Sequence, residues 1–369
     1  MSRYEFALAG PADDRQLRER MAQDWMEGRL AISFRREPSY FAGCRLQGER
    51  FQVIKCTDTG NGRIVGMGSR LTTTFHVNGQ PSRLGYLADL RVRPADRHRT
   101  VLARGYRFLH ALHLGDPVPF YLTLIFDGNA AALQNLVGAR AGLPHYRTQG
   151  RVLTPALHLD FARPALAIEG VAFERGRDAD YAALKAFVRR LAAGKQFSPA
   201  YSEADFEAGG KFAGLRASDF FVARSADGIQ ACLAAWDQSA QRQTHIERYS
   251  AALRFWRPIH NLASTVCPMR PLPAPGAQVP FVYLSCVAVQ GNDVGLFRGL
   301  LRYAYNQLRT GPWHHAIAGL HEQDPLASAL ADYRRIDAAG QLFVVHYPGD
   351  PDPVPDLDGR PRYFEMALA

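Results

Sequence analysis

The chain has 369 residues, of which 47% are hydrophobic and 21% are charged. These proportions exclude a disordered chain, and the length suits two folded domains better than one. Lysine and arginine number 44 against 35 acidic residues, a net charge of +9. This excess favours anionic ligands, but it is modest for a chain of this length and does not by itself indicate nucleic-acid binding.

The cysteines and the apolar runs indicate the cellular compartment. The five cysteines are scattered without a Cys-x-x-Cys pair, which favours free thiols in a reducing compartment. The first ten residues lack the apolar core of a signal peptide, and no later run reaches the length of a membrane span. We therefore expect a cytoplasmic protein without a membrane span.

The first elements in chain order are a strand and a helix. Residues 6–10 form an apolar run typical of a strand, and Asp13 and Asp14 open a helix that passes through Trp25. The pattern predicts further helical segments as far as about Phe41.

A strand pair follows. Residues 51–56 and 63–75 are apolar runs separated by the turn-forming sequence Asp-Thr-Gly-Asn-Gly, which predicts a hairpin. Gly66 and Gly68 lie in the second run. They lack the third glycine and the following helix of a dinucleotide-binding loop, so we interpret them as strand glycines or a bulge.

Residues 84–114 contain a strand, a basic loop and a helix. The strand ends at Val92, and helical spacing begins near Leu102. Residues 91–104 hold five arginines and His98, with Asp96 as the single acid. Exposed amides and the helix dipole favour negative charge at a helix N-terminus, so this loop predicts an anion site, with phosphate as the natural ligand.

The same order of elements then recurs. Residues 119–126 predict a buried strand and residues 130–137 a helix, before a linker at residues 162–165. The later segments repeat the series and include a strand at residues 281–289. The other segments predicted for this second copy are strands at 171–174, 220–224, 229–236, 315–320 and 342–346, and helices at 178–191, 294–308 and 326–333.

The basic loop resembles a known family. Its sequence Val92-x-Pro94-x-x-Arg97-x-Arg99 is similar to the acetyl-CoA-binding motif of the GNAT superfamily of N-acyltransferases, with Thr100 and Leu102 at the usual glycine positions. The sequence Asn129-x-x-Ala132 resembles the family's next coenzyme-binding step, and the likeness covers residues 6–159. The resemblance implies coenzyme contacts from Leu90, Arg91, Val92, Arg97, His98, Arg99, Thr100, Val101, Leu102, Asn129 and Ala132.

The resemblance also implies the architecture. We expect an α/β protein of the α+β mixed-sheet type, with two tandem GNAT-like domains whose mostly antiparallel sheets are flanked by helices. Residues 1–163 would carry the acyl-CoA site, and residues 164–369 would have a degenerate coenzyme motif because residues 290–293 place a carboxylate where phosphate would lie. In this fold two adjacent strands splay apart, and the edge at residues 90–92 would polarise the thioester carbonyl.

The attacking amine must lose a proton, so acyl transfer needs a proton acceptor. Asp89 is the candidate base, because burial in an apolar strand would raise its pKa; a structural salt bridge with Arg91 or Arg93 is the alternative. Counting from Asn129, the family's usual tyrosine position holds a leucine, Leu136. Tyr333, at the end of the corresponding second helix, is the candidate acid, and simple core packing is its alternative role.

The leading hypothesis is an N-acyltransferase that moves an acetyl or longer acyl group from coenzyme A to a small or amino-acid-like primary amine. No metal is expected, because His314, His315 and His321 do not form the paired pattern of a helical zinc site. One alternative is a non-catalytic pair that binds coenzyme A thioesters. A second uses acyl carrier protein as donor, and a third, nucleic-acid binding, lacks interleaved aromatics and a helix-turn-helix.

Overall fold

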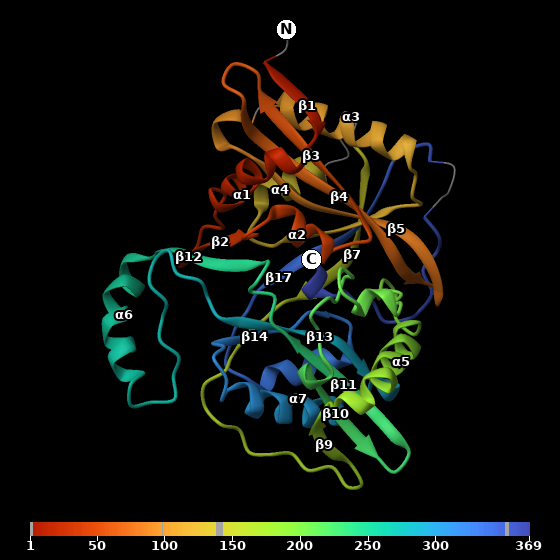
Figure 1. Ribbon diagram of the computed structural model, residues 1–369, viewed down its shortest axis with the longest axis vertical. Coiled ribbons are helices and arrows are strands. Elements are labelled where there is room, and N and C mark those ends of the chain that lie inside the picture. The colour runs from red at the N-terminus through yellow and green to blue at the C-terminus, as the bar shows by residue number, and fades with distance from the viewer. Residues whose placement is uncertain (1–2, 98, 138–142, 351–353) are drawn as a thin grey trace.

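The computed structural model describes residues 3–97, 99–137, 143–350 and 354–369. Two mixed sheets lie in the upper and lower halves of Figure 1, with helices on their faces. The predicted class of mixed sheets flanked by helices is confirmed. The helices are α1 (Asp14–Ala22), α2 (Tyr40–Arg45), α3 (Arg99–Gly115), α4 (Ala130–Leu136), α5 (Tyr181–Ala192), α6 (Ala251–Ala263) and α7 (Val294–Leu308).

The strands of each sheet are given in spatial order. The first sheet is β1 (Tyr4–Leu8), β3 (Arg50–Asp58), β4 (Arg63–Val77), β5 (Gln80–Val92), β6 (Tyr121–Phe126), β17 (Ala339–His346), β7 (His145–Leu153) and β15 (Leu320–His321). The second is β16 (Arg335–Ile336), β8 (Ala156–His158), β14 (His315–Ile317), β13 (Phe281–Val289), β11 (Gly228–Trp236), β10 (Phe220–Ser225) and β9 (Ala172–Arg175). Strands β2 (Leu30–Arg35) and β12 (Gln243–Tyr249) form a separate pair.

Helices cover both faces of each sheet. Successive residues of a strand point to opposite faces, so neighbouring residues pack in different cores. In β3, Val53 packs with α1 and α2, whereas Ile54 packs with α3. In the second sheet Val222 belongs to the core that contains α5, and Phe221 to the core that contains α7. The α5 core also takes in side chains of the first sheet, so one apolar core joins the two sheets.

The predicted hairpin at residues 51–75 is present. Strands β3 and β4 pair antiparallel, from Arg50 opposite Thr72 to Asp58 opposite Arg63. Gly62, with φ +68°, closes the turn by donating its N–H to the carbonyl of Asp58 at 2.9 Å. The turn sequence therefore sets the register of this strand pair.

The two halves repeat one strand arrangement. Strand β5 lies antiparallel to β4 and parallel to β6, and β13 likewise lies antiparallel to β11 and parallel to β14. The register slips at matching places, after Met67 in β4 and after Cys232 in β11. Asp89 and Cys286, opposite these slips, have φ values of +56° and +52°. The expected equivalence of residues 84–92 and 281–289 is confirmed.

Three expectations about elements differ from the structure. The helical segments expected as far as about Phe41 are interrupted by β2, a strand that pairs with β12 from the other half of the chain. The late strand around residues 342–346, assigned above to the second copy, is β17 and lies between β6 and β7 of the first sheet. The expected helix at residues 326–333 is a 3-10 helix, Pro325–Asp332.

The two sheets also exchange strands. Strand β8, which precedes residue 163, pairs with β14 in the second sheet, while β15 and β17 pair with β7 in the first. A division at residues 163 and 164 stays a proposal, and it would separate two units that complete each other's sheets.

Candidate active site

The first sheet splits between two parallel neighbours. Strand β5 pairs with β6 at Gly85–Tyr121 and Tyr86–Leu122, and this ladder goes no further although β5 continues to Val92. Glycine is required at position 85, next to the point where β5 and β6 separate, since a Cβ there would lie 2.0 Å from the Tyr121 ring. The splayed strands expected from the resemblance are therefore present, and the β5 edge beyond Leu87 is left without a β6 partner.

Asp89 lies at the bulge beside this open edge. Its Oδ2 accepts hydrogen bonds from Arg36 Nη2 at 2.5 Å and from the Tyr40 hydroxyl at 2.9 Å. The Tyr40 hydroxyl also contacts Ser69 Oγ at 2.7 Å, and Arg36 Nη2 donates to Gln47 Oε1 at 2.6 Å. The carboxylate is thus held in a buried polar network between α2 and the bulge.

The pKa of Asp89 differs from the expected one. Burial alone would raise its pKa, but the positive charges of Arg36 and Arg91 and the Tyr40 hydrogen bond hold that pKa below its ordinary value. The expected rise is therefore wrong, and Asp89 is ionised at neutral pH. Its ion-pair partner is Arg36, whereas Arg91 pairs with Asp24 at 3.3 Å and Arg93 with Asp96 at 2.5 Å.

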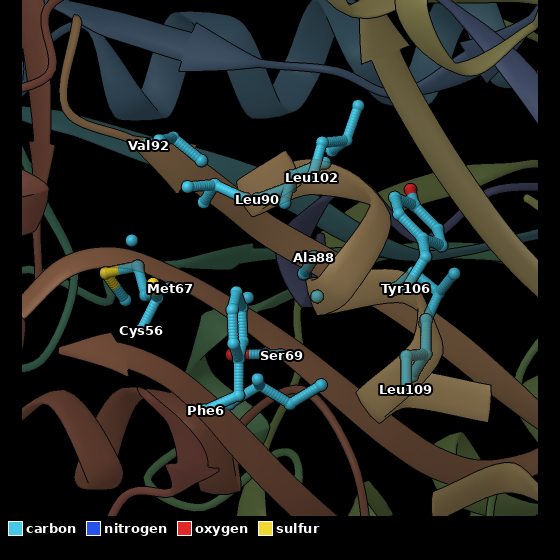
Figure 2. A pocket seen from close by; sticks show the side chains of 16 residues that line it. Phe6, Cys56, Met67, Ser69, Ala88, Leu90, Val92, Leu102, Tyr106 and Leu109 are labelled. Atoms are coloured by element: carbon cyan, nitrogen blue, oxygen red, sulfur yellow. The ribbon is translucent and has the colours of Figure 1, made fainter. Parts of the chain in front are cut away.

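An apolar cavity lies between α3 and strands β3, β4 and β5 (Figure 2). It holds about 580 Å³ of empty space, part of it open to solvent, and Ala88 and Leu90 from the split edge line it. Gly68 and Gly105 leave this space open because they carry no side chains. A Cβ at Gly68 would meet nothing nearer than Leu90, 3.8 Å away. Gly66 and Gly68 are strand glycines beside a bulge, as interpreted above, and they line the cavity.

The matching place in the second sheet is filled. The register slip aligns Gly68 with Leu233, which is fully buried against Phe297 and Leu300 of α7. The bulge amide is also occupied, because Cys286 donates its N–H to Glu365 Oε2 at 2.9 Å. Both sheets split, since β13 runs past its last β14 partner at Tyr283, but the space beside the split is filled in the second sheet.

The basic loop leads into the N-terminus of α3. Arg97 is half exposed, donates to the carbonyl of Val92 at 3.0 Å and forms an ion pair with Asp24 at 3.3 Å. Thr100 is exposed in the first turn. His98 and the side chain of Arg99 lie outside the described residues. The amides that begin α3 thus follow Arg97 closely in the chain, and a basic side chain at a helix N-terminus suits an anion.

The remaining predicted coenzyme residues divide between the core and a helix cap. Val101 is buried with Tyr4, Cys56 and Val65, and Leu102 lines the cavity. Asn129 caps α4 by accepting the N–H of Ala132 at 3.1 Å. The side chains of Val101 and Leu102 therefore pack inward, which leaves their backbone amides for any contact with a ligand at the loop.

Tyr333 lies in a different core. Its ring packs on Tyr305 with centroids 4.8 Å apart, and Arg302 Nε donates to its hydroxyl at 3.4 Å. Burial raises its pKa, so the phenol keeps its proton at neutral pH. The structure places Tyr333 against α7 of the second sheet and does not bring it to the split beside Asp89. Leu136 is buried in the core between α3 and the first sheet, with Leu109 and Ile125.

The sequence interpretation missed the residues that surround Asp89. Arg36 and Tyr40 come from a segment 53 and 49 residues earlier in the chain, and part of that segment was expected to be helical. Arg242 is partly buried and donates to the carbonyl of Ala367 at 2.7 Å and to that of Ala369. Burial lowers the pKa of Arg242. The charge of Arg36 lowers this pKa further, and the charge of Asp89 raises it. No local pattern indicates these long-range partners.

Comparison with solved structures establishes the fold class: the chain has the GNAT fold in tandem. Saccharomyces cerevisiae N-myristoyltransferase with bound myristoyl-CoA matches in two structures, with TM-scores of 0.61 and 0.59, identities of 11% and 10%, and 98% of this chain covered against 84% and 88% of theirs. An Enterococcus faecalis protein of unknown function, described as a probable N-acyltransferase, matches with a TM-score of 0.51 and 9% identity over 93% of this chain and 72% of its own. No protein-family model and no curated protein matches the sequence.

Two further properties concern the described residues only. None of their helices is long and apolar enough to cross a bilayer. They also contain no group of three or more histidine, cysteine, aspartate or glutamate side chains placed to hold a metal ion.

Proposed function

We propose that the protein is an N-acyltransferase that moves an acyl group from coenzyme A to a primary amine at the split between β5 and β6. The observation that carries this proposal is the open β5 edge with an apolar cavity beside it. At the matching place in the second sheet, Leu233 fills the space and Glu365 binds the bulge amide. The structures it resembles, among them an N-myristoyltransferase with bound myristoyl-CoA, support the reaction class.

The geometry suggests how the chain would act. The thioester arm would lie along the free edge of β5, where backbone N–H groups at residues 90–92 can stabilise the charge that develops on the thioester oxygen. The amine nitrogen forms the new C–N bond as the C–S bond breaks, and the thiolate leaves. The amine's proton passes to a base, for which we retain Asp89 as the candidate, although its lowered pKa makes it a weaker base than expected.

We propose that the coenzyme's phosphates lie at the N-terminus of α3, between Arg97 and Asn129, as the motif implies. The acyl chain would enter the cavity, so the preferred donor carries a chain longer than acetyl. The lining supports this choice because the side chains of Leu90, Leu102 and Leu109 offer no group for a polar ligand. The acceptor would be a small amine or an amino-acid-like molecule.

Titration with acyl-CoAs of increasing chain length tests the donor. We expect affinity to rise with chain length, since each buried methylene contributes about 0.8 kcal/mol, or roughly fourfold. Gly68→Val should fill the cavity and remove this gain while leaving acetyl-CoA binding unchanged. Gly115→Val, where a side chain would enter open space, is the matched control. Equal affinity for all chain lengths in the wild type would reject the cavity as the acyl site.

A second candidate function is thioester binding without catalysis. It is favoured by the hydrogen bonds from Arg36 and Tyr40 to Asp89, which occupy the proposed base. Binding of acyl-CoA with no free coenzyme A released in the presence of a panel of amines would support it. Failure of free coenzyme A to compete with the donor would instead indicate that acyl carrier protein carries the acyl group.

A further inference from the structure

Helix α6 forms a projecting arm. It stands apart from both sheets at the edge of the molecule (Figure 1), and none of its residues is buried. Ser250 caps its start by accepting the N–H of Leu253 at 3.5 Å. The chain returns through residues 268–280, which contain five prolines. The arm thus presents a single helix backed by its own return segment.

The polar side of α6 faces inward. Arg257 donates to the carbonyls of Leu272 and Pro273, both at 3.1 Å. Asn261 exchanges two hydrogen bonds with Leu272, at 3.1 and 2.8 Å, and His260 contacts the carbonyl of Arg270 at 2.9 Å. A surface helix normally turns its apolar side toward the protein. Here the return segment binds the polar side instead.

The apolar side of α6 faces outward. Phe255, Ile259 and Leu262 follow helical spacing and are 71%, 50% and 73% exposed, and Trp256 beside them is 57% exposed. Val266, in the turn that follows the helix, is 85% exposed. Scattered apolar residues on a surface are ordinary, but a continuous row of this kind marks an interaction site. The row includes the Phe255 and Trp256 rings, which meet edge to face with centroids 6.0 Å apart.

The charge around this row is positive. Residues 248–292 contain four arginines and one histidine but no aspartate or glutamate. Arg254 is exposed on α6, and the exposed Arg29 lies at its base, where its carbonyl accepts the N–H of Ser250 at 2.9 Å. Two acidic residues near the base are already paired, Glu27 with Arg248 at 2.8 Å and Glu247 with Arg35 at 2.7 Å.

We propose that α6 binds an anionic phospholipid surface, with its apolar row in the lipid interface and the exposed Arg254 and Arg29 at the headgroups. Helices that lie in the plane of a membrane combine aromatic and aliphatic side chains with basic residues in this way, and tryptophan favours the interface. A second copy of the chain is a poorer occupant. A symmetric contact through α6 would bring two arms of the same positive charge together.

Co-sedimentation of the full chain with vesicles tests the proposal. Vesicles of phosphatidylcholine and phosphatidylglycerol in equal parts should bind the protein, pure phosphatidylcholine should bind it much less, and rising salt should weaken binding. Phe255→Ser and Leu262→Ser should each weaken binding roughly tenfold or more, because each removes a side chain that enters the interface. Arg254→Glu should reduce binding to the anionic vesicles while keeping the apolar row intact.

Leu114→Ser is the matched control, since Leu114 is 68% exposed at the end of α3, away from the arm. It should bind vesicles like the wild type, and circular dichroism melting should show that all four variants keep their fold. Absence of vesicle binding by the wild type would overturn the proposal, as would equal losses in Leu114→Ser and Leu262→Ser. Self-association that Phe255→Ser abolishes, without vesicle binding, would identify a second copy as the occupant instead.

Discussion

At the scale of single residues, the Asp89 pair with Arg36 dominates the site. Both side chains are largely buried, at 12% and 3% exposure. A buried ion pair gives little net stability over apolar side chains, but removing one partner leaves an unpaired charge, which costs about 3–5 kcal/mol. The pair therefore complicates any test of Asp89, because a simple substitution changes stability and chemistry together.

A double substitution separates these two effects. Asp89→Asn should lower the free energy of unfolding by about 3–5 kcal/mol and slow acyl transfer about a hundredfold or more. Asp89→Asn combined with Arg36→Met should recover most of the stability in urea unfolding, because no charge is left unpaired. If Asp89 is the base, the stable double variant still fails to turn over. Recovery of activity in the double variant would show that Asp89 acts only through its pairing.

The pH dependence of stability follows from the same pair. The pKa of Asp89 is lower in the folded chain than its value of about 3.9 in an unfolded one. Its contribution is therefore fully present above pH 4 and declines as the pH falls below that value. Comparing urea unfolding of the wild type and the double variant from neutral pH downward isolates this group. A stability difference that does not change below pH 4 would contradict the assigned shift.

At the scale of elements, the sequence predicted what local patterns encode. The strand at residues 281–289, the hairpin at residues 51–75 and the helix after the basic loop follow from apolar runs and turn residues. Strand β2 was missed because its partner, β12, is about 200 residues away, and no local pattern reveals that pairing. The cavity was missed for a similar reason, since Gly68 and Gly105 open it only when α3 crosses β4.

The element that the motif does identify is the loop into α3, and its arginines provide a test. Arg97→Ala and Arg99→Ala should each weaken coenzyme A binding about ten- to a hundredfold, the value of a charge-assisted hydrogen bond. Asp24→Asn should leave binding unchanged or tighter, because it releases Arg97 from an ion pair. Arg107→Ala, an exposed change later in α3, is the control. If both arginine variants titrate like the wild type, the loop is not the phosphate site.

At the scale of the whole molecule, the repeat was visible in the sequence but its completion was not. The two copies of the bulged strand, β5 and β13, lie at equivalent places. Strands β8 and β17, however, each complete the other copy's sheet, an exchange between nearby sheets that pattern and order along the chain cannot show. The same exchange draws the last residues of the chain between the sheets, where Phe364 packs against Tyr86 and Glu365 reaches the bulge of β13.

This asymmetry predicts one acyl-CoA per chain, bound by the first unit. At the second sheet, the Asp293 carboxylate accepts the N–H of Leu296 at 2.9 Å and so occupies the N-terminus of α7, where a phosphate would lie. Leu233 fills the place that corresponds to the acyl cavity, and Glu365 binds the amide at the bulge of β13. Calorimetry should give a single site. Hydrogen exchange with bound acyl-CoA should slow across residues 84–115 and stay unchanged across residues 281–308, because a ligand protects the amides that it orders. Two sites, or protection confined to the segment containing Gly291 and Gly295, would show that the second unit binds coenzyme A despite its filled core.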